Sequence, residues 1–167
     1  EKVAPVTTPG ARPLVRAAEL AVRVSLVGEA LSISALSASR HAASHPLKID
    51  ELDLAPPGTG EILVRIKAAG LCHSDLSVIN GDRPRPMPMA LGHEAAGVVE
   101  QLGDGVQDLV VGDHVVLVFV PSCGHCHPCA EGRPALCEPG AAANGAGSLL
   151  NGARRLTRNG QTINHHL

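Results

Sequence analysis

The feature that most constrains this chain is a cluster of four cysteines within fifteen residues. Cys123, Cys126 and Cys129 are separated by two residues each, and Cys137 follows after seven more. A disulfide framework usually spreads its cysteines to join distant loops, so the clustering favours a metal site and a reducing compartment. Four thiolates at these spacings can surround one tetrahedral Zn²⁺, and a site with four protein ligands is closed and structural. The sequence therefore predicts a zinc lobe at residues 121–138.

Two other interpretations of the cluster stay open at this point. Cysteines two residues apart also bind iron–sulfur clusters, and two disulfides or a set of reactive thiols could use the same residues. A Cys-x-x-Cys redox pair normally begins a helix in a thioredoxin-like unit, for which we find no pattern here. His125 and His127 lie inside the lobe, and we expect them to face solvent because four thiolates already complete a tetrahedron.

The composition outside the lobe favours a β-rich domain. The 167 residues are 44% hydrophobic but 1% aromatic, and they include 18 Gly and 13 Pro, so aliphatic side chains form the core and turns are frequent. Strand-like segments at 47–52, 61–68, 95–102 and 114–120 are separated by turn signals, which predicts a small β-barrel. The net charge of −2 gives no electrostatic basis for binding nucleic acid. No apolar run is long enough to predict a membrane span.

The two ends of the chain differ from its middle. Residues 1–45 form an extension of uncertain structure, in which 17–38 could be an amphipathic helix or two strands. We expect one domain at 46–167, with a Gly/Ala-rich segment at 139–147 and a polar one at 151–167. No Gly-x-Gly-x-x-Gly stands between a strand and a helix, so the sequence does not predict a dinucleotide-binding unit.

A second group of metal-binding residue types precedes the lobe. The fifth cysteine, Cys72, lies close to Ser74 and Asp75, and His93 and Glu94 follow later in the chain. A thiolate, an imidazole and a carboxylate form an incomplete zinc site, as in catalytic sites with three protein ligands and one open position. From spacing alone, Cys72 is equally well a small buried hydrophobe and His93 a core histidine. The segment around Cys72 could also begin a helix, with Ser74 or Asp75 as its cap.

Together these segments resemble the zinc-dependent, medium-chain alcohol dehydrogenase family, specifically its N-terminal GroES-like catalytic domain. The pattern Gly-His-Glu-x-x-Gly-x5-Gly-x-x-Val, starting at Gly92, matches the family's zinc signature, and residues 70–75 match the segment that carries its first catalytic ligand. The four cysteines match its structural lobe. The resemblance covers residues 46–137 and extends toward Leu167. It implies a mainly β fold, a GroES-like, partly open β-barrel with an irregular four-cysteine zinc lobe.

The resemblance also implies roles for the metal-binding residues of the second group. Cys72 and His93 would be ligands of a catalytic zinc, and Glu94 would lie beside the metal as an alternate ligand or a supporting group. Asp75 would accept a hydrogen bond from the ring of His93 and so fix its tautomer.

The same resemblance implies three further site residues. Ser74 would hydrogen-bond the substrate hydroxyl and begin a proton relay, and His73 would contact the cofactor pyrophosphate. Phe119 would line the substrate pocket, although composition alone fits an ordinary core phenylalanine equally well. Ser77 stands where many relatives have a relay histidine, so the proton route differs from theirs.

In function, the resemblance implies a zinc-dependent dehydrogenase that interconverts a small-molecule alcohol and an aldehyde or ketone with NAD or NADP. The third catalytic ligand and the Rossmann domain of the family would lie beyond Leu167, so we expect this chain alone to be inactive. His165 or His166 could supply the ligand, although adjacent terminal histidines are more often solvated.

The alternative to a dehydrogenase is a stand-alone zinc-binding GroES-like interaction module without catalysis. In either case we expect a cytoplasmic protein that does not act on nucleic acid or membranes, and the resemblance leaves room for a homo-oligomer.

Overall fold

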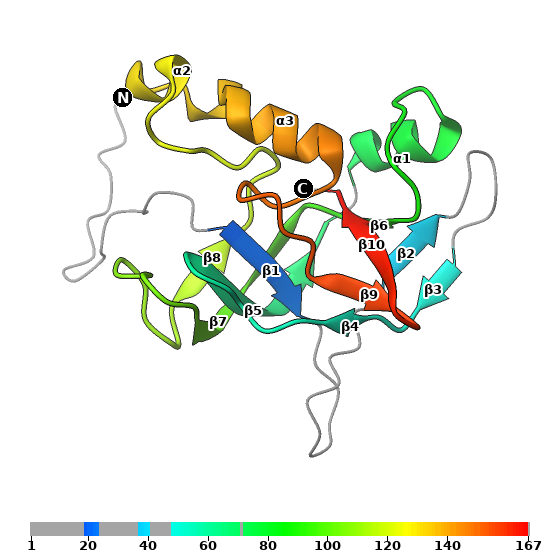
Figure 1. Ribbon diagram of the computed structural model, residues 1–167, viewed down its shortest axis with the longest axis horizontal. Helices are drawn as coiled ribbons and strands as arrows, with labels where there is room; N and C mark the ends of the chain where they lie inside the picture. The colour runs from blue at the N-terminus through cyan, green and yellow to red at the C-terminus, as the bar shows by residue number, and fades with distance from the viewer. Residues whose placement is uncertain (1–18, 24–36, 41–47, 71, 167) are drawn as a thin grey trace, which may run out of the picture.

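The computed structural model describes residues 19–23, 37–40, 48–70 and 72–166 and shows a mainly β fold (Figure 1). In chain order its elements are β1 (Glu19–Arg23), β2 (Ser37–Arg40), β3 (Lys48–Asp50), β4 (Asp53–Leu54), β5 (Glu61–Ala69), α1 (His73–Asn80), β6 (Met89–Leu91), β7 (Ala95–Leu102), β8 (His114–Val116), α2 (His127–Ala130), the 3₁₀ helix η1 (Pro134–Leu136), α3 (Glu138–Ala146), β9 (Leu156–Arg158) and β10 (Gln161–His165). None of the helices in this described part is long and apolar enough to cross a membrane.

The strands form two open sheets, and the helices lie together along one side of them (Figure 1). One sheet has the order β1-β5-β7-β8, and the other has the order β3-β2-β6-β10-β9-β4. Most neighbours are antiparallel, but β1 runs parallel to β5. In the other sheet β10 runs parallel to β6, with Asn164 opposite Met89 and His165 opposite Ala90. This pairing brings the end of the described chain beside the segment that leads to His93.

The core lies on both faces of β5. Successive side chains of a strand point to opposite faces, so Ile62 and Val64 pack with Val99 in one buried cluster. Leu63 points the other way, into a second cluster that includes Ile163. Burial is confined to the first part of the strand, residues 61–64, and the rest of β5 is more exposed.

The expected strands at 61–68 and 95–102 are confirmed as β5 and β7. The segment 114–120 is strand only at its start. Of the segment 47–52, residues 48–50 form β3, residues 51 and 52 are not strand, and Leu47 lies outside the described residues. Within the extension, the described parts of 17–38 are strands, and β1 pairs with β5.

Two local features differ from expectation. The Gly/Ala-rich segment forms α3, which begins after Cys137, whose Sγ accepts a hydrogen bond from Gly140 N at 3.3 Å and so caps the helix. The cap proposed for α1 is wrong, because the helix begins at His73 and the extended residue before it is Cys72. Ser74 lies in the first turn of α1, and its hydroxyl bonds the Cys72 and His93 side chains instead of the helix end.

Candidate active site and metal centres

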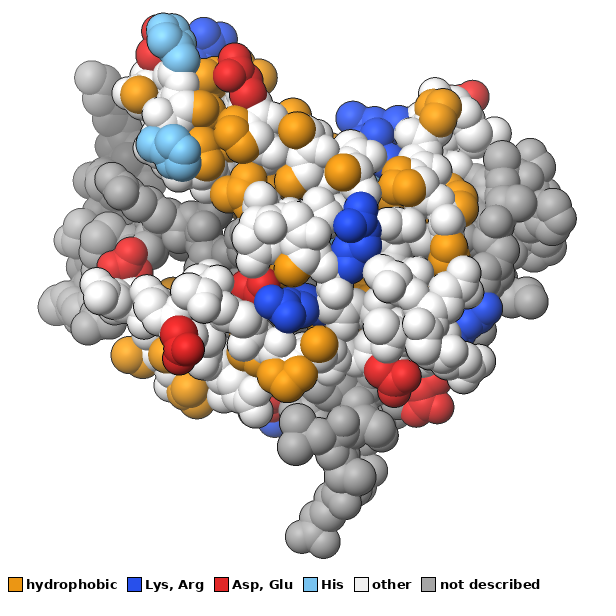
Figure 2. All heavy atoms as spheres, viewed as in Figure 1, with side chains coloured by type: hydrophobic (Ala, Val, Ile, Leu, Met, Phe, Trp, Pro, Cys, Tyr) orange, Lys and Arg blue, Asp and Glu red, His pale blue; other side chains and the backbone are white. Residues whose placement is uncertain are grey.

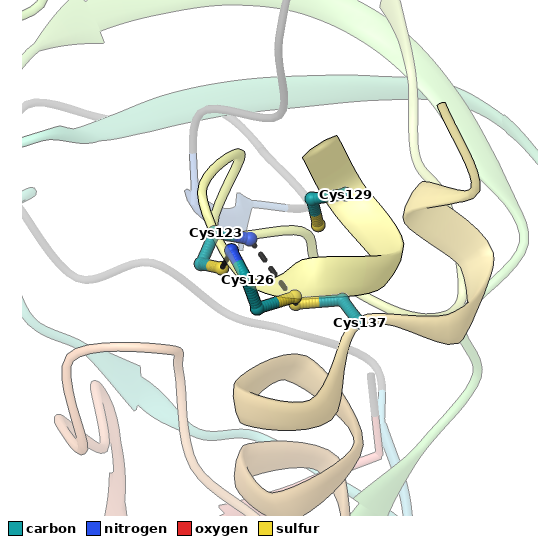
Figure 3. A group of neighbouring side chains, drawn as sticks. All are labelled: Cys123, Cys126, Cys129 and Cys137. Carbon is teal, nitrogen blue, oxygen red and sulfur yellow. Dashed lines mark hydrogen bonds between the residues drawn. The ribbon is translucent and has the colours of Figure 1, made fainter. Parts of the chain in front are cut away.

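The four clustered cysteines direct their sulfur atoms toward one point (Figure 3). Cys123 and Cys126 come from the loop before α2, Cys129 from α2 itself, and Cys137 from the junction of η1 and α3. All four Sγ atoms lie within 4.8 Å of one another, and the Cys126 and Cys137 sulfurs are 3.9 Å apart. A tetrahedron with Zn–S bonds of about 2.3 Å has sulfur–sulfur edges of about 3.8 Å. The arrangement therefore fits a tetrahedral zinc ion.

Backbone amides already point at these sulfurs. Cys123 N donates to Cys137 Sγ at 3.2 Å, and Cys126 N donates to Cys123 Sγ at 3.3 Å. Such bonds, led by one from the backbone of His125, lower the pKa of Cys123 to about 6. Loss of water contact, together with the neighbouring thiols, raises the pKa of Cys129 to about 12. Without a cation the four thiols cannot all ionise near neutral pH, whereas a bound metal requires them deprotonated.

The turns of the lobe require glycine at defined positions. Gly124 and Gly132 have φ values of +79° and +76°, a backbone conformation that residues other than glycine rarely adopt. His125 and His127 are exposed, as expected for residues that do not join the four sulfurs. Figure 2 shows histidine side chains on the surface at the end of the molecule that carries α2.

The second group of predicted ligands is also brought together. Cys72 precedes α1, while His93 and Glu94 lie between β6 and β7, and one donor atom of each lies within 4.8 Å of the others. Ser74 Oγ is 3.2 Å from Cys72 Sγ and 3.1 Å from His93 Nε2. His93 is buried and Glu94 is exposed, so the group is closed on one side and accessible on the other. Three donors with an accessible side suit a metal that keeps one open position.

Asp75 lies behind the ring of His93. Its Oδ1 atom is 3.4 Å from His93 Nδ1, which places the carboxylate where the resemblance puts it, although no hydrogen bond is formed at this distance. The same oxygen accepts hydrogen bonds from Gly92 N at 3.0 Å and from His166 Nδ1 at 2.7 Å. Burial acts to raise the pKa of Asp75, but these hydrogen bonds outweigh it and the pKa is lowered.

The electrostatics of the pocket keep His93 neutral. Burial lowers the pKa of His93, and the carboxylates of Asp75 and Glu94 only partly oppose that shift. A neutral imidazole has one ring nitrogen without a proton, and this nitrogen is the atom that binds metals. His93 therefore has the protonation state that a metal ligand needs.

The expectation that His165 and His166 are solvated is wrong. Their exposed fractions are 6% and 1%, because β10 and its end lie against β6 and β9. His165 Nε2 accepts a hydrogen bond from Arg155 N at 3.0 Å, whereas His166 faces Asp75. Sequence reasoning considered His166 only as a metal ligand and missed this contact, and no local spacing signals it.

Contacts of the Phe119 ring complete the site. The Phe119 ring lies 4.4 Å from the His93 ring and 5.7 Å from the His166 ring, measured between centroids. The Arg83 guanidinium lies 5.5 Å from the Phe119 centroid, a contact that the sequence did not indicate. His73 is exposed at the start of α1 and does not join the group around His93.

Comparisons with known proteins relate this chain to a described family. Residues 58–158 match the family described as the alcohol dehydrogenase GroES-like domain. S-(hydroxymethyl)glutathione dehydrogenase of Synechocystis sp. is 42% identical over 123 residues, which are 73% of this chain and 33% of that protein. NDMA-dependent alcohol dehydrogenase of Amycolatopsis methanolica is 47% identical over 120 residues, which are 72% of this chain and 32% of that protein. The chain thus spans about a third of the length of these curated relatives.

Solved structures share the same fold. An alcohol dehydrogenase zinc-binding domain protein from Burkholderia ambifaria matches with a TM-score of 0.72 and 40% identity, covering 78% of this chain and 35% of that chain. A short chain alcohol dehydrogenase (rspB) from E. coli CFT073, complexed with the cofactor NADH, matches with a TM-score of 0.53 and 38% identity, covering 60% of this chain and 29% of that chain.

Proposed function

Because the chain belongs to the alcohol dehydrogenase GroES-like domain family, we propose that it forms the zinc-holding catalytic part of a dehydrogenase that interconverts an alcohol and an aldehyde or ketone. One observation carries this proposal: the Ser74 hydroxyl lies between Cys72 Sγ and His93 Nε2, within 3.2 Å of both. A group that can move a proton is therefore adjacent to two residues that can hold a metal. The activity of the whole enzyme is part of the proposal, since the chain spans about a third of its relatives.

Cys72 and His93 would hold the catalytic zinc, with Glu94 at its exposed side. When bound, the metal supplies a Lewis acid that acidifies an alcohol hydroxyl, and NAD or NADP supplies the hydride acceptor. The residues of this chain prepare the site for both groups. The lowered pKa of His93 keeps its ring neutral, and Asp75, beside Nδ1, favours the tautomer that carries its proton there and leaves Nε2 free.

Ser74 would accept a hydrogen bond from the substrate hydroxyl and form the first member of a proton relay, since its Oγ can accept one hydrogen bond while it donates another. The Ser77 hydroxyl donates to the carbonyl of His73 at 3.2 Å and so is bound to the helix backbone instead of the site. His73 is exposed at the first turn of α1, where free amides favour an anion, and it would contact the cofactor pyrophosphate. Phe119, against the His93 ring, would form one wall of the substrate pocket.

The four-cysteine lobe at 121–138 would bind a second, structural zinc. Its donor set consists of four thiols and matches the soft ligands that zinc prefers. The lobe contains short helices with few buried side chains, so metal ligation would provide most of its stability. We assign residues 46–167 to one domain that includes this lobe, with β1 of the extension joined to its first sheet.

Metal content of the purified protein tests both sites. In the protein that contains this chain, we expect two equivalents of zinc per chain without added metal, measured by elemental analysis. Cys126→Ser should remove one equivalent and make the lobe sensitive to proteolysis, whereas Cys72→Ser should remove one equivalent and leave the lobe resistant. A Cys72→Ser variant that retains the zinc of the unmodified protein would refute the catalytic metal site.

Alcohol-dependent reduction of NAD⁺ or NADP⁺ by the protein that contains this chain tests catalysis. Proton transfer by a positioned side chain contributes about 100-fold or more to rate, so Ser74→Ala should lower kcat by about that factor. Ser77→Ala is the matched control, because it removes a hydroxyl of the same helix whose hydrogen bond goes to the His73 carbonyl. Equal loss of activity in both variants would show that Ser74 has no particular part in the reaction.

A further inference from the structure

The contact between His166 and Asp75 joins residues 91 positions apart in the chain. His166 Nδ1 lies 2.7 Å from Asp75 Oδ1, and His166 is 1% exposed. The contact depends on the parallel pairing of β10 with β6, which carries the end of β10 past the start of the His93 segment. A buried, short, charge-assisted hydrogen bond at such a separation is among the stronger polar contacts in a protein.

We propose that His166 is a positioning residue for His93 and acts through Asp75. This inference rests on the proposed function, in which His93 binds the catalytic metal. Asp75 Oδ1 accepts from His166 and from Gly92 N, and these two donors fix the carboxylate beside His93 Nδ1. Groups that orient a metal ligand from behind affect metal affinity about 10- to 100-fold. Donor atoms of Asp75, His93 and His166 also lie within 4.8 Å of one another, but in this proposal His166 acts through its hydrogen bond to Asp75 and not as a metal ligand.

The proton positions on His166 and His93, on either side of the Asp75 carboxylate, support this assignment. An ionised carboxylate only accepts hydrogen bonds, so Nδ1 of His166 carries a proton and donates it to Asp75. His166 Nε2 is buried and has no hydrogen-bond partner among the described residues. The metal requires a free Nε2 on His93, which places the His93 proton on Nδ1, the atom 3.4 Å from Asp75. A small movement of the ring closes this gap, provided that the carboxylate is held in place.

The ring of His166 also limits how His93 can turn. The two rings meet edge-on, with centroids 5.0 Å apart and an interplanar angle of 89°. Phe119 packs on both of them. Loss of the His166 hydrogen bond and loss of its ring are therefore separable effects, and two substitutions distinguish them.

His166→Phe keeps a ring and removes the donor, whereas His166→Asn removes the ring and keeps an N–H donor close to the position of Nδ1. The probe is Co²⁺, added to protein whose cysteine lobe has first been filled with zinc, so that its thiolate charge-transfer band reports the Cys72–His93 site. We expect His166→Phe to weaken cobalt binding about 10- to 100-fold and His166→Asn to retain most of the affinity. Zinc affinity of the lobe should be the same in all three proteins.

The tautomers of the unmodified protein provide a measurement that does not depend on any variant folding. Long-range ¹H–¹⁵N spectra should show His166 protonated at Nδ1 and not at Nε2, and His93 likewise. The reverse tautomer at His166 would overturn the proposal, and so would unchanged cobalt binding in His166→Phe or equal weakening in His166→Asn. If the unmodified protein binds no cobalt at this site, the proposed function fails together with this inference. If it binds cobalt and His166→Phe binds it equally well, the inference fails alone.

Discussion

Acid should destabilise this protein partly through one buried histidine, His165. Its side chain accepts a hydrogen bond from the Arg155 amide at 3.0 Å through Nε2, and its exposed fraction is 6%. A proton on Nε2 would replace this acceptor with a second donor. Burial, together with the charges of Arg154 and Arg155, lowers the pKa of His165 from 6.5 to about 4.

The sign and size of the effect follow from this shift. In the unfolded chain His165 binds a proton near pH 6.5, whereas the folded protein resists it until about pH 4. The contribution of His165 is therefore fully present above pH 6.5 and is lost as the pH falls toward 4. One proton corresponds to roughly 1.4 kcal/mol per pH unit, so the loss in the free energy of unfolding is about 3 kcal/mol over this window.

Urea unfolding at a series of pH values, followed by circular dichroism, measures this loss. Tryptophan and tyrosine fluorescence are not options, because the chain has neither residue. His165→Gln is the comparison variant, since its side-chain oxygen can accept the Arg155 amide and does not titrate. Between pH 6.5 and 4, the free energy of unfolding should fall less steeply with decreasing pH in the variant than in the unmodified protein. The two slopes should differ by up to about 1.4 kcal/mol per pH unit, the value for one proton. Identical slopes in both proteins would refute the reasoning, because His93 and the metal sites titrate in both.

Two further predictions concern the lobe and the zinc signature. In metal-free protein, iodoacetamide should modify Cys123 first, with an apparent pKa of about 6, and Cys129 last. Bound zinc should protect both cysteines. Mass spectrometry of peptides measures the order of modification, and the reverse order would contradict this prediction. Gly97→Ala should destabilise the protein by roughly 1 to 3 kcal/mol in urea unfolding, because the added methyl group would meet the Arg65 carbonyl in the neighbouring strand. Gly145→Ala in α3 should instead be neutral or stabilising, because no neighbouring atom of the described residues lies within 4 Å of the added methyl group. An equal cost at both glycines would contradict this account.

The lobe was predictable because its chemistry is local. All four cysteines fall within fifteen residues, so their spacing alone limits how far apart the sulfur atoms can lie. β5 and β7 were predictable for a similar reason, since each is a run of strand-forming residues between turn signals. The cap of α1 was not, because Ser74 and Asp75 are both good capping residues in isolation. Their side chains instead bond groups around His93 and Gly92, and these tertiary contacts replace the local ones.

The remaining site residues illustrate the same distinction. Cys72, His93 and Glu94 are residue types that bind metals, and the resemblance of the sequence to the dehydrogenase family predicts that they share one site. Only the fold determines that their donor atoms lie within 4.8 Å of one another, since Cys72 lies before α1 whereas His93 and Glu94 lie between β6 and β7.

By itself, the sequence determined the cysteine lobe, the β-rich character and the family pattern, because each depends on residue type and spacing along the chain. The tertiary structure alone decided that His165 and His166 are buried and that His166 reaches Asp75. Two histidines at a polar chain end carry no local signal of burial. Their environment comes from the pairing of β10 with β6, a contact between segments more than seventy residues apart.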